Sequence, residues 1–191
     1  MFKLDKIELF NVNMDYLKAL NTIDSEVYYI NSIVYENKPY VGVLVNNDGL
    51  DYIIPLTSAK NKHKNWKNVS RESYLIFEFI NNSDLGDNDI YVSQESSDIV
   101  KKIISVLDIK KMIPVKEGLY TKIDIESIES TNEKYADLLN KEIFFLRDKK
   151  QSIADKANKI YIEQKESGVV KQFHCNFSVL EAVCKSYSVS K

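Results

Sequence analysis

The chain has 191 residues, enough for one domain with its own hydrophobic core. Its 44% hydrophobic and 28% charged residues are typical of a globular protein and exclude a largely disordered one. The net charge of −2 argues against a general nucleic-acid coat protein, and two cysteines are too few for a disulfide framework. No apolar run is long enough to cross a bilayer and the first residues lack a signal-peptide core, so we expect a cytoplasmic protein with no membrane partner.

The first third of the chain predicts a helix followed by a hairpin. Residues 3–10 suggest a short strand, and residues 13–24 carry apolar side chains at helical spacing. Two strands follow at 40–45 and 52–56. The link at 46–49 reads Asn-Asn-Asp-Gly, whose residues tolerate positive φ, so the two strands are predicted to pair as an antiparallel hairpin.

The middle of the chain combines a polar loop with short strands. Residues 57–71 are polar and basic and are predicted to form a long loop, and residues 81–88 are rich in turn-forming residues. Apolar and aromatic segments predict strands at 74–80, 90–92, 103–107 and 112–115.

From Asn132 onward the apolar spacing is helical. Gly168 is expected to end the second helix of this part, and a last helix is expected to begin near Asn176, with Ser178 and Glu181 as an alternative capping box. A strand-rich first two-thirds and a helical last third predict an α+β protein that forms one domain over residues 1–191.

Positive charge is concentrated in one window of the sequence. Residues 52–71 contain no acidic residue and carry Lys60, Lys62, Lys64, Lys67 and Arg71. Residues 81–100 show the opposite balance, with five acidic residues and no basic one. A local basic surface of this kind is expected where a protein meets phosphate.

The most informative segment reads Pro-Leu-Thr-Ser-Ala-Lys-Asn-Lys-His at residues 55–63. It presents the hydroxyls of Thr57 and Ser58, the amine of Lys60 and the imidazole of His63 where a strand runs out into a loop. Cleavage of RNA without a metal ion needs a group to remove the 2′-hydroxyl proton, a group to protonate the leaving 5′-oxygen, and cations to stabilise the phosphoryl oxygens. The segment contains residue types for each task, although serine, threonine and lysine are also common in ordinary turns.

The hairpin brings a second lysine toward this segment. The start of one hairpin strand lies near the end of the other, so Lys38 is expected to lie close to residues 57–60. Tyr35 precedes Lys38 and is a further candidate for contact with RNA.

Four segments of the chain resemble the ToxN/AbiQ toxins of type III toxin–antitoxin systems. They are the PLTSAK segment followed by Lys62 and His63, the KPYVG segment that begins at Lys38, the KMIPV segment at 111–115, and the CNFSVLE segment at 175–181. The four occur in the family's order and span most of the chain. Ala59 stands where the family frequently has proline.

The resemblance implies a compact, antiparallel β-barrel-like core related to the MazF/Kid toxins, with flanking helices. It implies a metal-independent endoribonuclease without a cofactor, with a catalytic site at Lys38, Thr57, Ser58 and Lys60. Attack by the ribose 2′-hydroxyl on the adjacent phosphorus would leave 2′,3′-cyclic phosphate and 5′-hydroxyl ends. The implied partners are a small antitoxin RNA made of repeated pseudoknots, the antitoxin precursor and mRNA as substrates, and a toxin–RNA hetero-oligomer that acts in abortive infection against phage.

Contact with RNA is predicted for a set of residues around the basic window: Tyr35, Lys62, His63, Lys64, Trp66 and Lys67. For Trp66, the alternative is an anchor that holds the loop to the body of the protein. His174, Cys175 and Cys184 do not have the spacing of a four-ligand zinc site, so no metal is predicted. The competing functions are a non-catalytic RNA-binding module and a structural or protein-binding domain with a basic surface loop.

Overall fold

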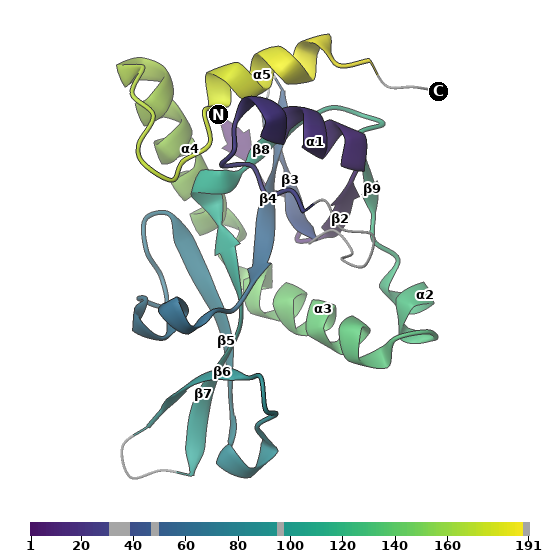
Figure 1. The fold of residues 1–191 in the computed structure, drawn as a ribbon, viewed down its shortest axis with the longest axis vertical. Helices are drawn as coiled ribbons and strands as arrows, with labels where there is room; N and C mark the ends of the chain where they lie inside the picture. Colours follow the sequence, from purple (N-terminus) through teal and green to yellow (C-terminus); the bar gives the residue numbers. More distant parts are fainter. Residues whose placement is uncertain (31–38, 47–49, 95–97, 189–191) are drawn as a thin grey trace.

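The computed structural model describes residues 1–30, 39–46, 50–94 and 98–188. Its strands are β1 (Phe2–Lys3), β2 (Leu9–Val12), β3 (Tyr40–Asn46), β4 (Asp51–Ser58), β5 (Ser73–Asn81), β6 (Ile90–Ser93), β7 (Ile99–Asp108), β8 (Ile113–Val115) and β9 (Tyr120–Lys122). Its α-helices are α1 (Met14–Ile23), α2 (Ile125–Glu129), α3 (Glu133–Leu146), α4 (Lys150–Ser167) and α5 (Phe177–Ser186). Short 3-10 helices are η1 (Asn61–Asn65), η2 (Asn82–Asp84), η3 (Ile109–Lys111) and η4 (Arg147–Lys149). The predicted α+β class is confirmed (Figure 1).

The strands form one antiparallel sheet in the order β5-β7-β4-β3-β2-β9, to which β1, β6 and β8 add at β3, β7 and β4. The predicted hairpin is confirmed, with Tyr40 of β3 opposite Pro55 of β4. Its register shifts after Val41, where Gly42 adopts a φ of +55°. A Cβ atom at Gly42 would lie 2.4 Å from Leu4 Cδ1, so only glycine fits this position without a shift of its neighbour.

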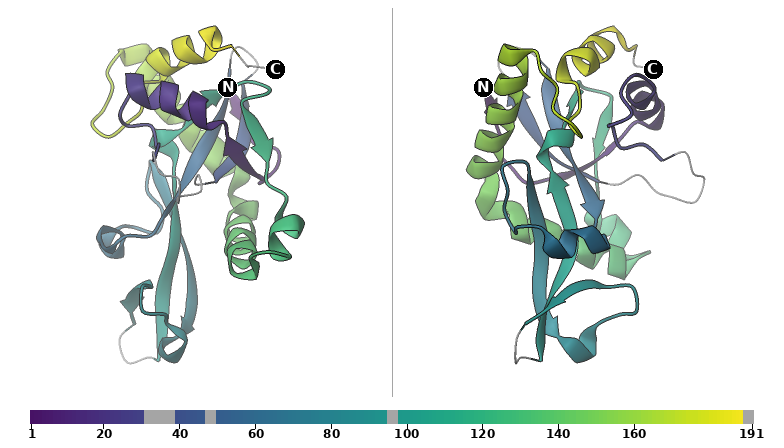
Figure 2. Two further views of the ribbon diagram at one scale, coloured as in Figure 1. Left: turned by 45° about the vertical axis from the view of Figure 1, so that its right-hand side comes forward. Right: turned by 60° about the vertical axis from the view of Figure 1, so that its left-hand side comes forward.

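The expected barrel-like core related to the MazF/Kid toxins is not confirmed. Among the described residues no pairing joins β5 to β9, so the sheet stays open. The physical reason lies in the long β5–β7 pair, which extends from Ser73 opposite Asp108 to Asn81 opposite Ile99. The outer half of this pair, together with β6, projects beyond the rest of the sheet as an arm (Figures 1 and 2).

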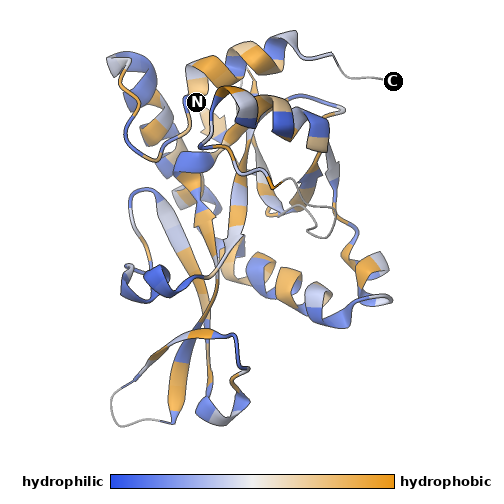
Figure 3. Cartoon of the chain, in the orientation of Figure 1, coloured by the Kyte–Doolittle hydropathy of each residue, from blue (hydrophilic) through white to orange (hydrophobic). Residues whose placement is uncertain are grey.

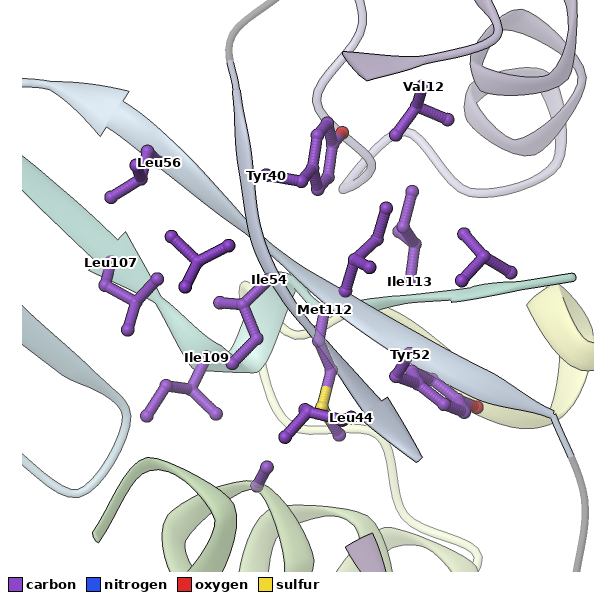
Figure 4. Packing of buried hydrophobic residues seen from close by; sticks show 14 of the residues in the cluster. Val12, Tyr40, Leu44, Tyr52, Ile54, Leu56, Leu107, Ile109, Met112 and Ile113 are labelled. Carbon is purple, nitrogen blue, oxygen red and sulfur yellow. The ribbon is translucent and has the colours of Figure 1, made fainter. Parts of the chain in front are cut away.

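The helices cover different parts of the sheet. Helices α1 and α5 contact each other at one end of the molecule, α4 contacts β1, and α3 contacts β5 and β7 near the base of the arm (Figures 1 and 2). The helices carry alternating hydrophobic and hydrophilic bands, as expected for helices with one buried face (Figure 3). Between helices and sheet lie Tyr52, Ile54, Leu56, Met112 and Ile113, each at most 2% exposed (Figure 4).

Most predicted elements are confirmed, with corrections at their boundaries. The single strand expected at 3–10 is instead two short strands, β1 and β2. The loop expected at 57–71 starts later, because Thr57 and Ser58 still pair with β7, and η1 lies within it. Strand β9 and helix α2 were not predicted. No helix in the described ranges is long and apolar enough to span a membrane.

The helix ends follow the predicted local chemistry. Gly168 ends α4 with a φ of +66°, and its N–H donates to the Gln164 carbonyl at 3.0 Å. Asn176 caps α5, because its side chain accepts the Val179 N–H at 3.3 Å. The alternative cap at Ser178 is therefore not used.

One buried carboxylate connects α5 to the sheet. Tyr52 and Tyr161 donate their hydroxyls to Glu181 Oε1 at 2.8 and 2.7 Å, and Lys165 Nζ lies 2.9 Å from Oε2. Burial by itself raises the pKa of Glu181, but the hydrogen bonds from Tyr161, Lys165 and Tyr52 outweigh burial and hold the pKa below its usual value. The Glu181 of the CNFSVLE segment is thus a structural residue.

Replacing Glu181 with glutamine is expected to lower the free energy of unfolding by about 1–3 kcal/mol near neutral pH, because charge-assisted hydrogen bonds are lost. Because the pKa of Glu181 is lower in the folded protein than in the unfolded chain, its ionised form stabilises the fold at a pH above the unfolded-state pKa. This stabilisation disappears as pH falls through the folded-state pKa. The difference between wild type and Glu181→Gln should therefore shrink as pH falls below about 4.3. Urea unfolding over a pH series measures this difference in the free energy of unfolding. The exposed Glu166→Gln is the control, and an equal pH trend in both variants would contradict the assignment.

Candidate functional site

The end of β4 presents its two hydroxyls to opposite faces, because side chains alternate along a strand. Thr57 is 7% exposed and lines a pocket of about 550 Å³. Ser58 is exposed and lines a separate hollow of about 420 Å³ between the arm and α3. The structure therefore separates two residues that the sequence placed in one catalytic group.

The larger pocket brings together five of the predicted site residues: Thr57, Lys60, Lys62, His63 and Trp66. They come from the end of β4, from η1 and from the turn after it. The rest of the lining comes from α1 and the segment that follows it, from the start of β3, from the β7–η3 junction and from Phe173. We call this feature the Thr57 pocket.

Lys60 is held in the Thr57 pocket by a local exchange of hydrogen bonds with His63. The Lys60 N–H donates to His63 Nδ1 at 3.0 Å, and the His63 N–H donates to the Lys60 carbonyl at 2.8 Å. Because Nδ1 accepts, neutral His63 carries its proton on Nε2. His63 is only 3% exposed, so it fixes the backbone at Lys60 and presents only part of its ring to the pocket.

Trp66 forms the rim of the pocket with two lysines. Its ring centroid lies 4.6 Å from that of His63, and the Nζ atoms of Lys62 and Lys110 each lie 5.5 Å from the indole. Trp66 is partly exposed, so it both anchors the loop and offers an aromatic surface.

The remaining basic residues of the window lie outside the Thr57 pocket. Lys64 Nζ lies 5.3 Å from the ring centroid of Tyr91 on β6, which directs it toward the arm. Lys67 is exposed. Arg71 pairs with Glu163 of α4, so its charge is partly compensated.

Lys38 and Tyr35 lie outside the described residues. The chain directly after Lys38 is placed: the Pro39 carbonyl accepts the Leu56 N–H at 2.9 Å. The start of β3 therefore lies beside the end of β4, as the predicted hairpin required, one residue from Thr57.

Tyr28 and Asp108 are pocket residues that the sequence analysis missed. The Tyr28 hydroxyl donates to Asp108 Oδ2 at 3.1 Å. Burial and the neighbouring Asp108 carboxylate raise the pKa of Tyr28 above its usual value, and a hydrogen bond from Thr57 acts in the opposite direction. Thr57, Tyr28 and Asp108 thus lie together in the pocket. The only sequence signal for Asp108 is a carboxylate that ends an apolar strand.

Two further lysines line the pocket, and each is paired with carboxylates that offset part of its charge. Lys110 lies 3.3 Å from Asp108 Oδ1 and 3.8 Å from Glu72 Oε2, and Lys111 pairs with Glu26. Both follow β7 directly and both line the pocket. Their signal in the sequence is the pair of lysines at 110 and 111, the second of which begins the KMIPV segment.

The CNFSVLE segment holds the pocket wall in place. The Cys175 N–H donates to the Lys110 carbonyl at 3.1 Å, and the Asn176 N–H donates to Asp24 Oδ2 at 2.7 Å. Gln164 of α4 donates to the Cys175 carbonyl at 2.9 Å and accepts the Phe177 N–H at 2.8 Å. The segment thereby joins η3, the end of α1 and α4 around the pocket.

The site combines the Thr57 hydroxyl with several lysines around a concave space. Such groups can orient a phosphodiester and stabilise negative charge on its oxygens. Within the described ranges, no group of three or more His, Cys, Asp or Glu side chains is arranged to hold a metal ion.

Comparison with known proteins supports the resemblance inferred from the four segments. The chain is 29% identical to endoribonuclease ToxN of Bacillus thuringiensis subsp. kurstaki, an alignment that covers 98% of this chain and 87% of that protein. It is 26% identical to endoribonuclease AbiQ of Lactococcus lactis subsp. lactis, in an alignment that covers 95% of this chain and 90% of that protein.

A solved structure extends this similarity to the fold. It shows a type III toxin inhibited selectively by a non-coding RNA pseudoknot, and it superposes with a TM-score of 0.73 at 27% identity. The match covers 96% of this chain and 98% of the other. The family model for "Toxin ToxN, type III toxin-antitoxin system" matches residues 8–185. The chain therefore belongs to the ToxN family of toxins from type III toxin–antitoxin systems.

Proposed function

We propose that this protein is an endoribonuclease toxin that cuts RNA without a metal ion, in the cytoplasm, with residues 1–191 acting as one domain. The observation that carries the proposal is the convergence of Thr57, Lys60 and Lys62 with Lys110 and Lys111 on one pocket. A phosphodiester bound there would meet a hydroxyl and several ammonium groups. The relatives named above are endoribonucleases.

In the proposed reaction the ribose 2′-hydroxyl loses its proton and attacks the adjacent phosphorus. The bond to the 5′-oxygen breaks, and that oxygen takes up a proton. The products are a 2′,3′-cyclic phosphate and a 5′-hydroxyl, and no water is consumed in this step. Thr57 orients the phosphate, and Lys60 stabilises the charge that develops on its oxygens.

The other predicted catalytic residues stay part of the proposal. Lys38 precedes the start of β3, next to the end of β4, and would approach the same phosphate. Ser58 is retained on sequence grounds, although its side chain lines the hollow beside the arm and not the Thr57 pocket.

The proposed regulator is an antitoxin RNA of repeated pseudoknots, which the toxin also processes from its precursor. The support is the structure of the similar toxin with its inhibitory RNA pseudoknot. RNA bound across Lys62, Lys64 and Lys67 would cover the mouth of the Thr57 pocket and exclude mRNA. We also propose that toxin and RNA assemble into a hetero-oligomer.

Chelation tests the proposed chemistry. Cleavage of a defined RNA by the purified protein should persist at an unchanged rate in EDTA, because lysines supply the positive charge that a metal would otherwise provide. Gel analysis should show cyclic phosphate ends, which resist phosphatase until acid opens them. Loss of activity in EDTA that Mg²⁺ or Zn²⁺ restores would contradict the mechanism. If the purified protein binds RNA but does not cut it, the result supports the competing function, a non-catalytic RNA-binding module.

A further inference from the structure

Lys60 differs from the other lysines of the Thr57 pocket in its surroundings. Lys110 and Lys111 are paired with carboxylates, and Lys62 Nζ lies 5.5 Å from the Trp66 ring centroid. Lys60 is exposed, and within the described ranges its ammonium forms no ion pair. Its charge is therefore available to a bound phosphate, and the direction of its side chain depends on the backbone from which that side chain starts.

The backbone leaves the sheet at Lys60. The N–H of the preceding Ala59 still donates to the Ile104 carbonyl of β7 at 3.3 Å, whereas the Lys60 N–H donates to His63 Nδ1 at 3.0 Å. A side chain that reaches back over three residues to the N–H at the start of a helix is half of a capping box. Because the Lys60 carbonyl accepts the His63 N–H, His63 holds Lys60 on both sides of its Cα atom, at φ −137° and ψ +159°.

His63 is itself held by Trp66. The two ring centroids lie 4.6 Å apart, and the Trp66 N–H donates to the His63 carbonyl at 3.1 Å. Trp66 in turn packs against a buried cluster of β5 and β7, formed by Leu75, Ile103 and Val106. The imidazole is only 3% exposed, so it contacts protein groups on nearly all sides. Its place in the fold is therefore that of a support for Lys60, with little surface for RNA.

Charged and titratable groups from several elements surround His63. They are Lys60, Lys62 and Lys64 in or next to η1, Tyr91 on β6, Glu26 and Tyr28 after α1, Asp108 at the end of β7, and Lys110 and Lys111 of η3. Among these groups only the imidazole ordinarily changes its charge between about pH 5 and 8. His174 is the only other histidine of the chain and does not line the pocket.

We propose that His63 is a positioning residue for RNA cleavage: Nδ1 accepts the Lys60 N–H and thereby directs the Lys60 ammonium to the phosphate, while the imidazole itself transfers no proton. This role differs from the direct RNA contact predicted from the sequence. It requires neutral histidine, because both ring nitrogens are donors once the ring is protonated. The inference rests on the proposed function, in which Lys60 stabilises the phosphoryl oxygens.

Two variants separate the acceptor from the ring. In His63→Asn the side-chain oxygen can take the place of Nδ1, but the ring is lost. In His63→Phe a ring remains against Trp66, but the acceptor is lost. Above about pH 8, single-turnover cleavage by His63→Asn should stay close to wild type. Cleavage by His63→Phe should fall by about 100-fold, because a small displacement of a catalytic group costs about that much. Both variants should bind an RNA with a 2′-deoxy nucleotide at the cut site, which cannot be cleaved, nearly as tightly as wild type.

The order of wild type and His63→Asn should reverse at low pH. Wild type slows as Nδ1 gains a proton, whereas asparagine keeps its acceptor, so wild type should be the slower of the two below about pH 6. The ratio of the two rate constants cancels every ionisation that both proteins share. Trp66 is the only tryptophan, and a protonated imidazole in ring contact quenches its fluorescence. The fluorescence midpoint should coincide with that of the rate ratio, and His63→Asn should show no such transition.

A double-mutant cycle tests whether His63 acts through Lys60. In a Lys60→Ala background, His63→Phe should cause almost no further loss of cleavage, because the group that it positions is already absent. Lys159→Ala provides the control background, since Lys159 is exposed on α4. There His63→Phe should keep its full loss of about 100-fold. Melting temperatures establish that each variant is folded.

The outcomes are separable. Equal losses in folded His63→Asn and His63→Phe would mean that the imidazole transfers a proton or binds RNA, and would overturn the inference. Wild-type cleavage by His63→Phe, or additive losses with Lys60→Ala, overturns it as well. If the variants do not fold, a wild-type rate that stays constant across the fluorescence midpoint still overturns it. A wild type that cuts no RNA contradicts the proposed function, whereas cleavage that does not depend on His63 contradicts only its positioning role.

Discussion

Replacing Lys60 with alanine is expected to reduce RNA cleavage by about 100- to 1,000-fold, which is the cost of removing one preorganised group that stabilises transition-state charge. Lys60 is exposed and lines the Thr57 pocket, while its backbone is fixed by His63. Removing the side chain therefore removes charge without disturbing the core, and the melting temperature should barely change.

Lys64→Ala is the matched control for this prediction. Lys64 lies in η1, four residues after Lys60, and is also exposed, but its amine lies over Tyr91. Single-turnover cleavage of one defined RNA should fall steeply in Lys60→Ala and only slightly in Lys64→Ala. Equal losses in the two variants would mean that the basic surface acts as a whole and that Lys60 has no special role.

Changing Lys62, Lys64 and Lys67 together to glutamate is expected to weaken RNA binding by at least about 100-fold at low salt, because phosphate contacts are lost and counterions are no longer released. Each lost contact should reduce the slope of log affinity against log salt by about 0.7–0.9. Filter binding of the antitoxin RNA over a salt series measures both quantities. Residual cleavage by the variant should also escape inhibition by that RNA.

The control variant for charge reversal carries the same change in net charge on another part of the surface. Lys3, Lys159 and Lys185 are exposed on β1, α4 and α5, away from the Thr57 pocket. Their replacement by glutamate should leave the salt slope near the wild-type value. Arg71 is left unchanged because it pairs with Glu163. An unchanged affinity and slope in the Lys62, Lys64 and Lys67 variant would place the antitoxin on another surface.

Local signals in the sequence were enough to identify most elements. The helical spacing of residues 13–24 corresponds to α1, and Gly168 and Asn176 mark the end of α4 and the start of α5. These predictions succeed because caps and turns depend on residues within one helical turn of each other. Strand β9 and the two-residue β1 were missed because such short strands exist only through pairing with distant partners.

The sequence by itself determined the α+β class, the hairpin and the segment that carries Thr57 and Lys60. Only the tertiary structure decided which side chains share a pocket. It placed Ser58 on the face opposite Thr57, because β4 continues as a strand up to Ser58. It also brought Tyr28, Asp108 and Phe173, which lie far apart in the chain, to one pocket. Periodicity shows which face of an element is buried, whereas the neighbours of that face depend on strand order and long-range pairing, which no local pattern encodes.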